Sequence, residues 1–188
     1  GSGTSYNLTD TTRGGGATYD ALNRSYSTAA RGATLFTDSD NIWGTNAASN
    51  RQTVAADAHY GVATTWDYYK NEHGRNGIRN DGVGALTRVH YGRNYANAFW
   101  SDSCFCMTYG DGNAQIRPLT SLDVAGHEMT HGVISTTANL VYSGESGGLN
   151  EATADIFGAM VEFHANNPND PADYLIGEKL FANGTSVI

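Results

Sequence analysis

The chain has 188 residues, of which only 16% are charged, and its net charge of -8 at pH 7 goes with an isoelectric point near 5.0. This balance argues against nucleic acid as a partner and leaves carboxylates free for cations, and no apolar run approaches the roughly 18 residues of a membrane span. The 23 glycines and 11 tyrosines indicate a loop-rich globular protein rather than a disordered one.

Residues 1–50 are rich in Gly, Thr, Asn and Asp, and they predict turns and short twisted strands. The composition changes over residues 51–73, where apolar side chains recur at three- and four-residue steps. These side chains are Val54, Ala58, Val62, Trp66 and Tyr69. The spacing predicts one long helix with a single buried stripe, capped by Ser49 or Asn50 and ended by Gly74.

Three strands are expected next, over residues 85–91, 98–100 and 104–109. Two helices should follow, over roughly 122–136 and 149–166. The expected buried face of the last helix consists of Ala152, Ile156, Met160 and Phe163. Strands first and helices later indicate the α+β class, with an antiparallel β-rich sheet backed by the long helix and two further helices forming a site.

The segment His127–His131 reads His-Glu-Met-Thr-His and falls within the first of these two helices. Residues four apart on a helix differ by only about 40° in direction, so His127 and His131 project side by side and can hold one metal ion. Glu128 then flanks the ion without binding it, which is the position of a general base. On these five residues alone, a metal site and an ordinary helix remain equally open.

A catalytic zinc site takes three protein ligands and leaves a fourth position for water. The known pattern with a third histidine is excluded, because Thr137 occupies that position. Glu151, near the start of the following helix, offers a carboxylate instead. Asp155 lies one turn further on the same face, where it can accept the second N–H of a ligating histidine.

With these residues the sequence resembles the thermolysin family of secreted zinc endopeptidases. The resemblance covers about residues 6–178 and is carried by Asp57–Tyr60, Trp66–Asn71, Val89–Tyr91, Asn97–Trp100, Met107–Gly112, His127–His131, Leu140–Tyr142, Gly144–Gly147 and Asn150–Asp155. It implies an N-terminal β-rich domain over residues 1–138, ending in the histidine helix. It also implies that residues 139–188 begin a helical second domain.

The resemblance implies that one zinc ion is bound by His127, His131 and Glu151. Glu128 would deprotonate the water held by the metal and pass the proton to the leaving amine. Tyr142 would donate a hydrogen bond to the tetrahedral oxyanion. These roles imply hydrolysis of peptide bonds in peptides or proteins.

The resemblance also assigns residues around the metal and the substrate. Asp155 and Asn150 would orient the two ligating histidines. Asn97 and the backbone of Ala98 would bind an extended peptide as an added edge strand. An apolar substrate residue after the scissile bond would enter a pocket lined by Ile116, Leu119, Val124 and Ile176.

One or two calcium ions are implied as well, since oxygen ligands from several segments suit Ca²⁺. The ligands of the first site would be Asp123, Glu162, Asp173, the Leu175 carbonyl and Glu178. A second, weaker candidate site uses Asp38, Asp40 and a nearby carbonyl, although Asp- and Asn-rich turns are also common without an ion.

Cys104 and Cys106 depart from the family pattern because they lie in a short insertion. In a flat strand their side chains would be too far apart for an easy bond, but a bulge would permit a Cys104–Cys106 disulfide. We expect that disulfide, which is typical of a secreted, extracellular protein. The remaining histidines, His59, His73, His90 and His164, are expected to be structural or solvent-facing.

A larger departure from the family pattern is the length of the chain. Family members carry a helical domain that supplies a histidine and an aspartate for the transition state and an arginine for the substrate, and none is found after Glu178. We therefore expect a zinc endopeptidase that is active when the missing half is present. The alternatives are a catalytically silent zinc- and calcium-binding fragment, or one half of a nicked protease whose C-terminal domain is a separate chain. A non-enzymatic adhesion or sugar-binding β module is disfavoured.

Overall fold

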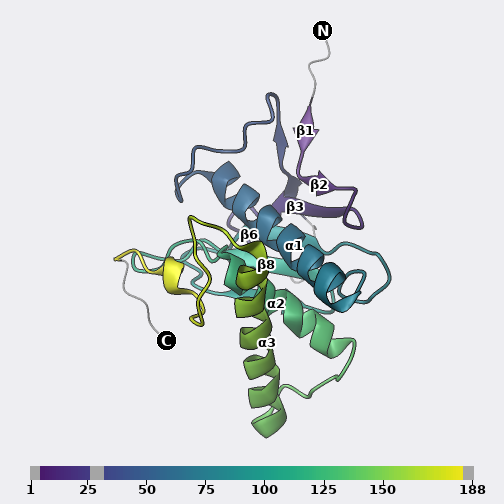
Figure 1. Cartoon of the computed structure of the whole chain (residues 1–188). Coiled ribbons are helices and arrows are strands. Elements are labelled where there is room, and N and C mark those ends of the chain that lie inside the picture. The colour runs from purple at the N-terminus through teal and green to yellow at the C-terminus, as the bar shows by residue number, and fades with distance from the viewer. Residues whose placement is uncertain (1–4, 26–31, 184–188) are drawn as a thin grey trace.

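The computed structural model describes residues 5–25 and 32–183 and has an α+β architecture, as expected (Figure 1). Its helices are α1 (Arg51–His73), α2 (Leu122–Ser135), α3 (Gly144–Ala165) and the 3-10 turn η1 (Glu178–Leu180). Its strands are β1 (Tyr6–Asn7), β2 (Thr9–Asp10), β3 (Gly16–Asp20), β4 (Thr34–Leu35), β5 (Thr37–Asp38), β6 (Leu86–Tyr91), β7 (Ala98–Ser101) and β8 (Cys106–Gly110).

The main sheet is mixed rather than antiparallel, which corrects the sequence-based expectation. Its order is β2-β3-β6-β8-β7, with β4 also paired to β3, and the two central pairs β3–β6 and β6–β8 are parallel. The long connection through α1 returns the chain to the sheet in the same direction, as a parallel pair requires. β8 then inserts between β6 and β7, so β7 becomes an edge strand.

Both ends of α1 are fixed by local hydrogen bonds, and both predictions for it are confirmed. The Asn50 side chain accepts from the Thr53 N–H at 3.0 Å, which satisfies one of the free donors of the first turn. Gly74 adopts a left-handed conformation with φ 63°, and its N–H donates back to the last turn. The predicted stripe is buried, apart from Val62, which is half-buried.

The core lies between α1, the central strands and α2. Its buried members include Val54, Ala58, Val89, Met107, Tyr109, Val124, Ala125 and Met129. Gly61 allows α1 and α2 to approach closely, because a Cβ atom at this position would lie only 2.7 Å from the Ala125 Cβ. The packing of α2 against α1 and the sheet therefore fixes the helix that carries both motif histidines.

The face of α3 that was expected to be buried is exposed, which is a second correction. Ile156 and Met160 are 61% and 41% exposed, and Ala152 and Phe163 are also exposed. The buried residues of α3 are Asn150, Ala154, Gly158, Ala159, Val161 and Glu162. A Cβ atom at Gly158 would lie 2.7 Å from the Asp123 carbonyl oxygen, so small residues mark the contact with α2. The helix also begins at Gly144 rather than near residue 149.

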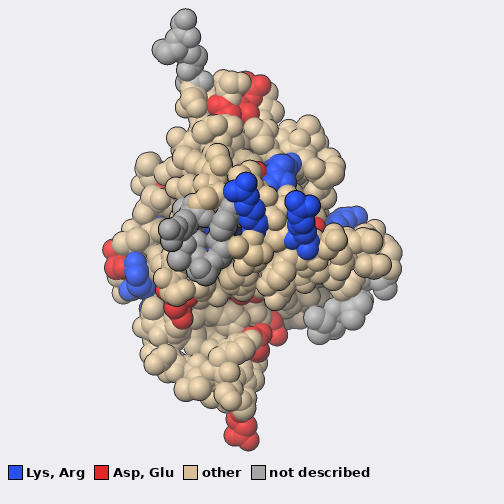
Figure 2. Space-filling view, turned by 180° about the vertical axis from the view of Figure 1, so that it is seen from behind, with Lys and Arg blue, Asp and Glu red and all other residues tan. Residues whose placement is uncertain are grey.

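Charged side chains are spread unevenly over the surface. On the face turned away from the viewer in Figure 1, Lys and Arg gather near the middle, while Asp and Glu lie mostly toward the ends and sides (Figure 2). No helix in the described residues is long and apolar enough to cross a membrane. Two acidic clusters, which are described below, lie beside α3.

Candidate metal centre

Three potential ligand atoms converge where α2 packs on α3. The Nε2 atoms of His127 and His131 are 3.1 Å apart, and the Glu151 carboxylate lies 3.3 Å from the first and 3.4 Å from the second. A tetrahedral zinc ion with bonds of about 2.0–2.1 Å would separate its ligand atoms by about 3.3 Å. The three predicted ligands are thus spaced as zinc requires.

The second nitrogen of each histidine faces an acceptor, as predicted. The Nδ1 atom of His127 lies 2.7 Å from Asp155 Oδ1, and that of His131 lies 2.6 Å from Asn150 Oδ1. The Asn150 amide is oriented by its own donation to the Leu140 carbonyl at 3.2 Å. Both Nδ1 atoms therefore carry the hydrogen, which leaves two Nε2 lone pairs pointing toward one another and toward a carboxylate. Such a donor set calls for a cation.

Glu128 stands beside this set rather than within it. One of its oxygens lies within 4.8 Å of a nitrogen of each motif histidine. On the side away from the histidines, the Glu128 carboxylate meets the edge of β7, where its Oε2 atom accepts from the Trp100 N–H at 3.1 Å. Burial, with a further contribution from Glu151, raises the pKa of Glu128 to about 8. A carboxylate that is poorly solvated and held by one donor suits proton transfer.

Tyr142 lies at the open side of the centre. Its hydroxyl donates to Glu151, its ring contacts that of His131 at 5.8 Å between centroids, and the residue is 68% exposed. The hydrogen bond to Glu151 raises the pKa of Tyr142 to about 12, so its phenol keeps its proton at neutral pH. An exposed phenol next to the converging ligands can donate to a bound molecule.

The metal centre opens into a cleft of about 610 Å³. One wall comes from the β7 side and the other from the link between α2 and α3. The lining residues are Asn97, Trp100, Asp102, His127, Glu128, His131, Ser135, Asn139, Leu140, Val141, Tyr142, Asn150 and Glu151. Because β7 is an edge strand, its free side is available to pair with an extended chain.

The residues predicted for substrate binding lie in different environments. Asn97 is exposed in the cleft, whereas Ala98 is only 3% exposed and is not among the residues that line it. Leu119 and Val124 belong to the core, with Ile116 packed against it. Ile176 is half-buried before η1 and is not part of that cluster. Three of the four residues predicted for the apolar pocket thus belong to or pack against one core cluster, and none of the four is among the residues that line the cleft.

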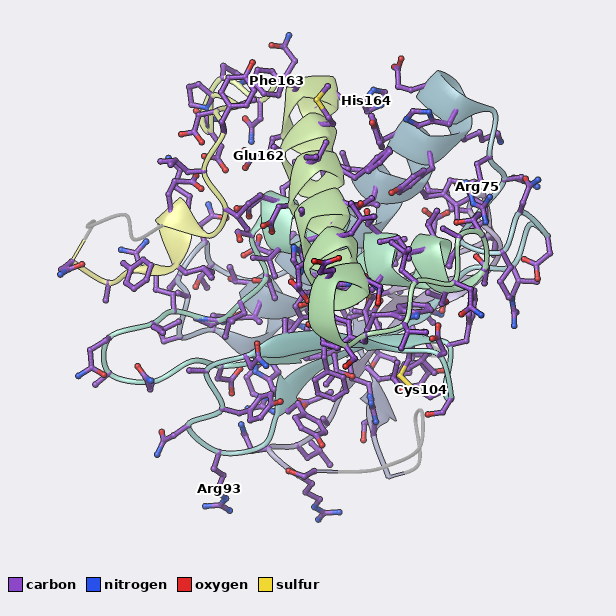
Figure 3. The ribbon with its side chains drawn as sticks, turned by 90° about the horizontal axis from the view of Figure 1, so that it is seen from below. Arg75, Arg93, Cys104, Glu162, Phe163 and His164 are labelled. Carbon is purple, nitrogen blue, oxygen red and sulfur yellow. A yellow bond between two sulfur atoms is a disulfide. The ribbon has the colours of Figure 1, made fainter. Side chains whose placement is uncertain are left out.

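A second acidic cluster lies between α3 and the C-terminal segment. Oxygens of Glu162, Asp170 and Glu178 lie within 4.8 Å of one another, and Figure 3 shows Glu162 on the side of α3 that faces this segment. Burial, with repulsion from four neighbouring carboxylates, raises the pKa of Glu162 to about 8. Glu178 Oε2 is buried and has no hydrogen-bond partner among the described residues. An unbonded carboxylate oxygen amid like charges favours a cation here.

The other predicted calcium ligands surround this cluster. Asp123 is 1% exposed and accepts from the Gly177 N–H, and Asp173 accepts from the Leu175 N–H at 2.6 Å. Asp170 was missed by sequence reasoning. It lies in a loop between Asn169 and Pro171, where an acidic residue ordinarily reads as a solvated turn. Lys179 supplies a partial counter-charge, at 3.1 Å from Asp170.

The Asp38–Asp40 turn differs from the acidic cluster beside α3, because most of its carboxylate oxygens already have hydrogen-bond donors. Asp38 Oδ1 accepts from the backbone N–H groups of Asp40 and Asn41 at 2.8 and 2.7 Å, and its other oxygen accepts from Gln52 at 2.9 Å. Asp40 Oδ1 accepts from the Ile42 N–H at 2.9 Å. Three of the four carboxylate oxygens thus have donors, and no third acidic group joins them among the described residues.

Cys104 and Cys106 are joined by a disulfide, with their Cα atoms 5.2 Å apart. Phe105 between them has φ 50° and turns the chain before β8 begins. The histidines outside the metal centre have hydrogen-bond partners elsewhere in the fold. These pairs are His59 with Thr18, His73 with Tyr68, His90 with Asp111, and His164 with Glu72.

The family assignment follows from comparison with known proteins. The model described as "Thermolysin metallopeptidase, catalytic domain" matches residues 1–135, and "Thermolysin metallopeptidase, alpha-helical domain" matches residues 138–187. The chain belongs to the thermolysin metallopeptidase family, as its motifs predicted.

Individual relatives agree with this assignment. The chain is 67% identical to the transglutaminase-activating metalloprotease of Streptomyces mobaraensis, over 97% of this chain and 23% of that protein. It is 47% identical to bacillolysin of Bacillus cereus, over 97% of this chain and 31% of the relative. The solved structure of the protealysin precursor from Serratia proteamaculans matches with a TM-score of 0.74 and 35% identity, covering 94% of this chain and 52% of that one. The chain thus spans less than a third of these two curated relatives.

Proposed function

We propose that the chain carries the metal-binding and proton-transferring part of a zinc endopeptidase. The observation that carries this proposal is the spacing of His127, His131 and Glu151, at 3.1 to 3.4 Å between ligand atoms, with Glu128 beside them. Zinc, when bound, would polarise the scissile carbonyl and make a water molecule acidic enough to attack at neutral pH.

The side chains around the metal would have separate roles in the reaction. Glu128 would accept the proton of the attacking water and return it to the leaving amine, while the Trp100 N–H holds one of its oxygens in place. Tyr142 would exchange its hydrogen bond to Glu151 for one to the developing oxyanion of the substrate. Asp155 and Asn150 would keep both Nε2 lone pairs directed at the ion.

The peptide substrate would lie along the free edge of β7. Asn97 and the Ala98 backbone would hold it as an added strand, and an apolar side chain after the scissile bond would be received by Ile116, Leu119, Val124 and Ile176. This orientation places the leaving-group side of the substrate at the Asn97 end of the strand. In this proposal residues 1–138 form one domain and residues 139–188 begin the next.

Calcium would bind the acidic cluster beside α3. The ligands would be Asp123, Glu162, Asp173, the Leu175 carbonyl and Glu178, and we add Asp170 because it lies with Glu162 and Glu178. The ion would relieve the repulsion that raises the pKa of Glu162. Asp38 and Asp40 remain a prediction for a second ion. The Cys104–Cys106 disulfide supports the proposal that the protein is secreted.

A second candidate function is metal binding without efficient turnover, either as a silent fragment or as one half of a nicked protease. It is favoured by the cleft, because no described residue after Glu151 lines it. Further groups that face the cleft, beyond its two described walls, would then come from further sequence. Both candidates agree on the metal and differ on hydrolysis.

Metal analysis and a peptide assay together test the proposal. The purified protein should contain one zinc per chain, and Glu151→Gln should lower that content. Glu128→Gln should retain zinc and lose hydrolysis. Zinc at full occupancy without hydrolysis would favour the second candidate, and absence of zinc would reject both.

A further inference from the structure

Asp102 is a carboxylate in the cleft that the proposed catalysis does not use. It directly follows β7, is exposed to solvent and lines the cleft together with Trp100 and Ser135. The cleft lining within the described residues contains three acidic side chains and no lysine or arginine. Two of these, Glu128 and Glu151, belong to the metal centre. The charge of Asp102 is therefore available to a ligand of the cleft.

The Asp102 carboxylate is held in place from two elements. Its Oδ1 atom accepts from the Trp100 indole N–H at 2.7 Å and from the Ser135 hydroxyl at 2.7 Å. Trp100 belongs to β7 and Ser135 ends α2, so the two donors come from different elements of the fold. Oδ2 has no hydrogen-bond donor within the described part of the chain. A carboxylate with one oxygen anchored and one available loses little conformational freedom when it binds a cationic group.

The position of Asp102 along β7 determines which part of a peptide it would meet. At the other end of the strand, the Asn97 carbonyl accepts from the Gly110 N–H at 3.0 Å, and Leu119 donates to the Gly110 carbonyl at 3.2 Å. That end therefore adjoins the apolar pocket assigned to the residue after the scissile bond. Glu128 contacts Trp100 between the two ends. Asp102 consequently lies toward the residues before the scissile bond.

We infer that Asp102 selects peptide substrates with a lysine or arginine side chain on the acyl side of the scissile bond. This inference rests on the proposed function and adds a charge preference to it. A long basic side chain can lie along the cleft wall and place its cationic head at Oδ2. With zinc bound, Glu128 and Glu151 belong to the metal centre, and the Asp102 charge disfavours acidic substrate side chains at the same end of the cleft.

Matched peptides test the inference with the complete protein that carries this sequence, loaded with zinc. One series places arginine, and a second its neutral isostere citrulline, at each of the three positions before the scissile bond. At one of these positions, kcat/KM for arginine should exceed that for citrulline by about two- to five-fold, the range of a solvent-accessible ion pair. The preference should fall as salt is added. Calorimetry with the Glu128→Gln protein should show the same preference in binding, without turnover.

Two variants separate the charge from the shape of the site. Asp102→Asn keeps an acceptor for Trp100 and Ser135 but removes the charge, so the arginine preference should fall to about one. Glu72→Gln is the control for the charge. Glu72 lies near the end of α1 and contacts His164, which is roughly 20 Å along α3 from Glu151, so this variant should retain the preference.

Two results would overturn the inference: no preference at any position, or a preference that persists in Asp102→Asn. Either would leave Asp102 as a structural acceptor only. The citrulline peptides distinguish this failure from failure of the proposed function. If they are not hydrolysed by a Glu128-dependent reaction, the proposed function itself is wrong, and the inference with it.

Discussion

Replacement of Gly158 by alanine tests the close packing that positions Glu151 against the two histidines. A Cβ atom at this position would lie 2.7 Å from the Asp123 carbonyl oxygen and 3.2 Å from the His127 nitrogen, both backbone atoms of α2. Restoring an ordinary contact of about 3.4 Å would move the two helices apart by roughly 0.7 Å, a form of overpacking. Metal-ligand distances tolerate only about 0.2 Å.

Gly158→Ala should therefore destabilise the protein by about 1–3 kcal/mol. A glycine-to-alanine change in a helix usually has the opposite effect on stability, because alanine is ordinarily favoured over glycine by roughly 0.5–1 kcal/mol. Zinc affinity should fall by about 10- to 100-fold, the range seen when ligand orientation is disturbed. Thermal unfolding and competition with a metal chelator measure the two effects.

Gly148→Ala is the matched control. It lies on the same helix, and a Cβ atom there would meet nothing within 4 Å. This variant should gain stability by roughly 0.5–1 kcal/mol and keep its zinc affinity. If Gly158→Ala were as stable as Gly148→Ala and bound zinc equally well, the close contact between α2 and α3 would be refuted.

Three further predictions concern the two metal sites. Glu128→Gln should lower kcat by at least about 10²-fold while zinc content stays at one per chain, and hydrolysis that survives the change would show that another group is the base. Asn150→Ala should weaken zinc binding by about 10- to 100-fold, measured by chelator competition, because His131 loses the acceptor that fixes its tautomer; unchanged affinity would contradict that role. Calcium at about 100 times its dissociation constant should stabilise the protein by about 2.7 kcal/mol, and Glu162→Gln should abolish most of this gain in thermal unfolding; equal gains in both proteins would place the ion elsewhere.

The features that could be predicted from the sequence are those fixed by local chemistry. Both ends of α1 depend on short-range hydrogen bonds, in which Asn50 binds the first turn and Gly74 binds back to the last. The proposed metal ligands could also be predicted from the sequence. Helical spacing places His127 and His131 on one face, and few residues remain as candidates for the third ligand.

Non-local features were harder to predict. The parallel pairs of the sheet depend on β8 inserting between β6 and β7, and strand order carries no local signal. On α3 the large apolar side chains suggested the wrong face, since the contact with α2 is built from Gly158 and other small residues. Asp170 reaches the acidic cluster from an irregular loop, where residue spacing does not indicate direction.

X-ray absorption spectroscopy at the zinc edge tests the central claim most directly. The wild-type protein should show one zinc ion bound by two imidazole nitrogens and one carboxylate, at about 2.0–2.2 Å, with a remaining light-atom ligand. The carboxylate contribution should be lost or altered in Glu151→Gln. A zinc-free protein, or a spectrum unchanged by that substitution, would contradict the assignment of His127, His131 and Glu151 as the metal centre.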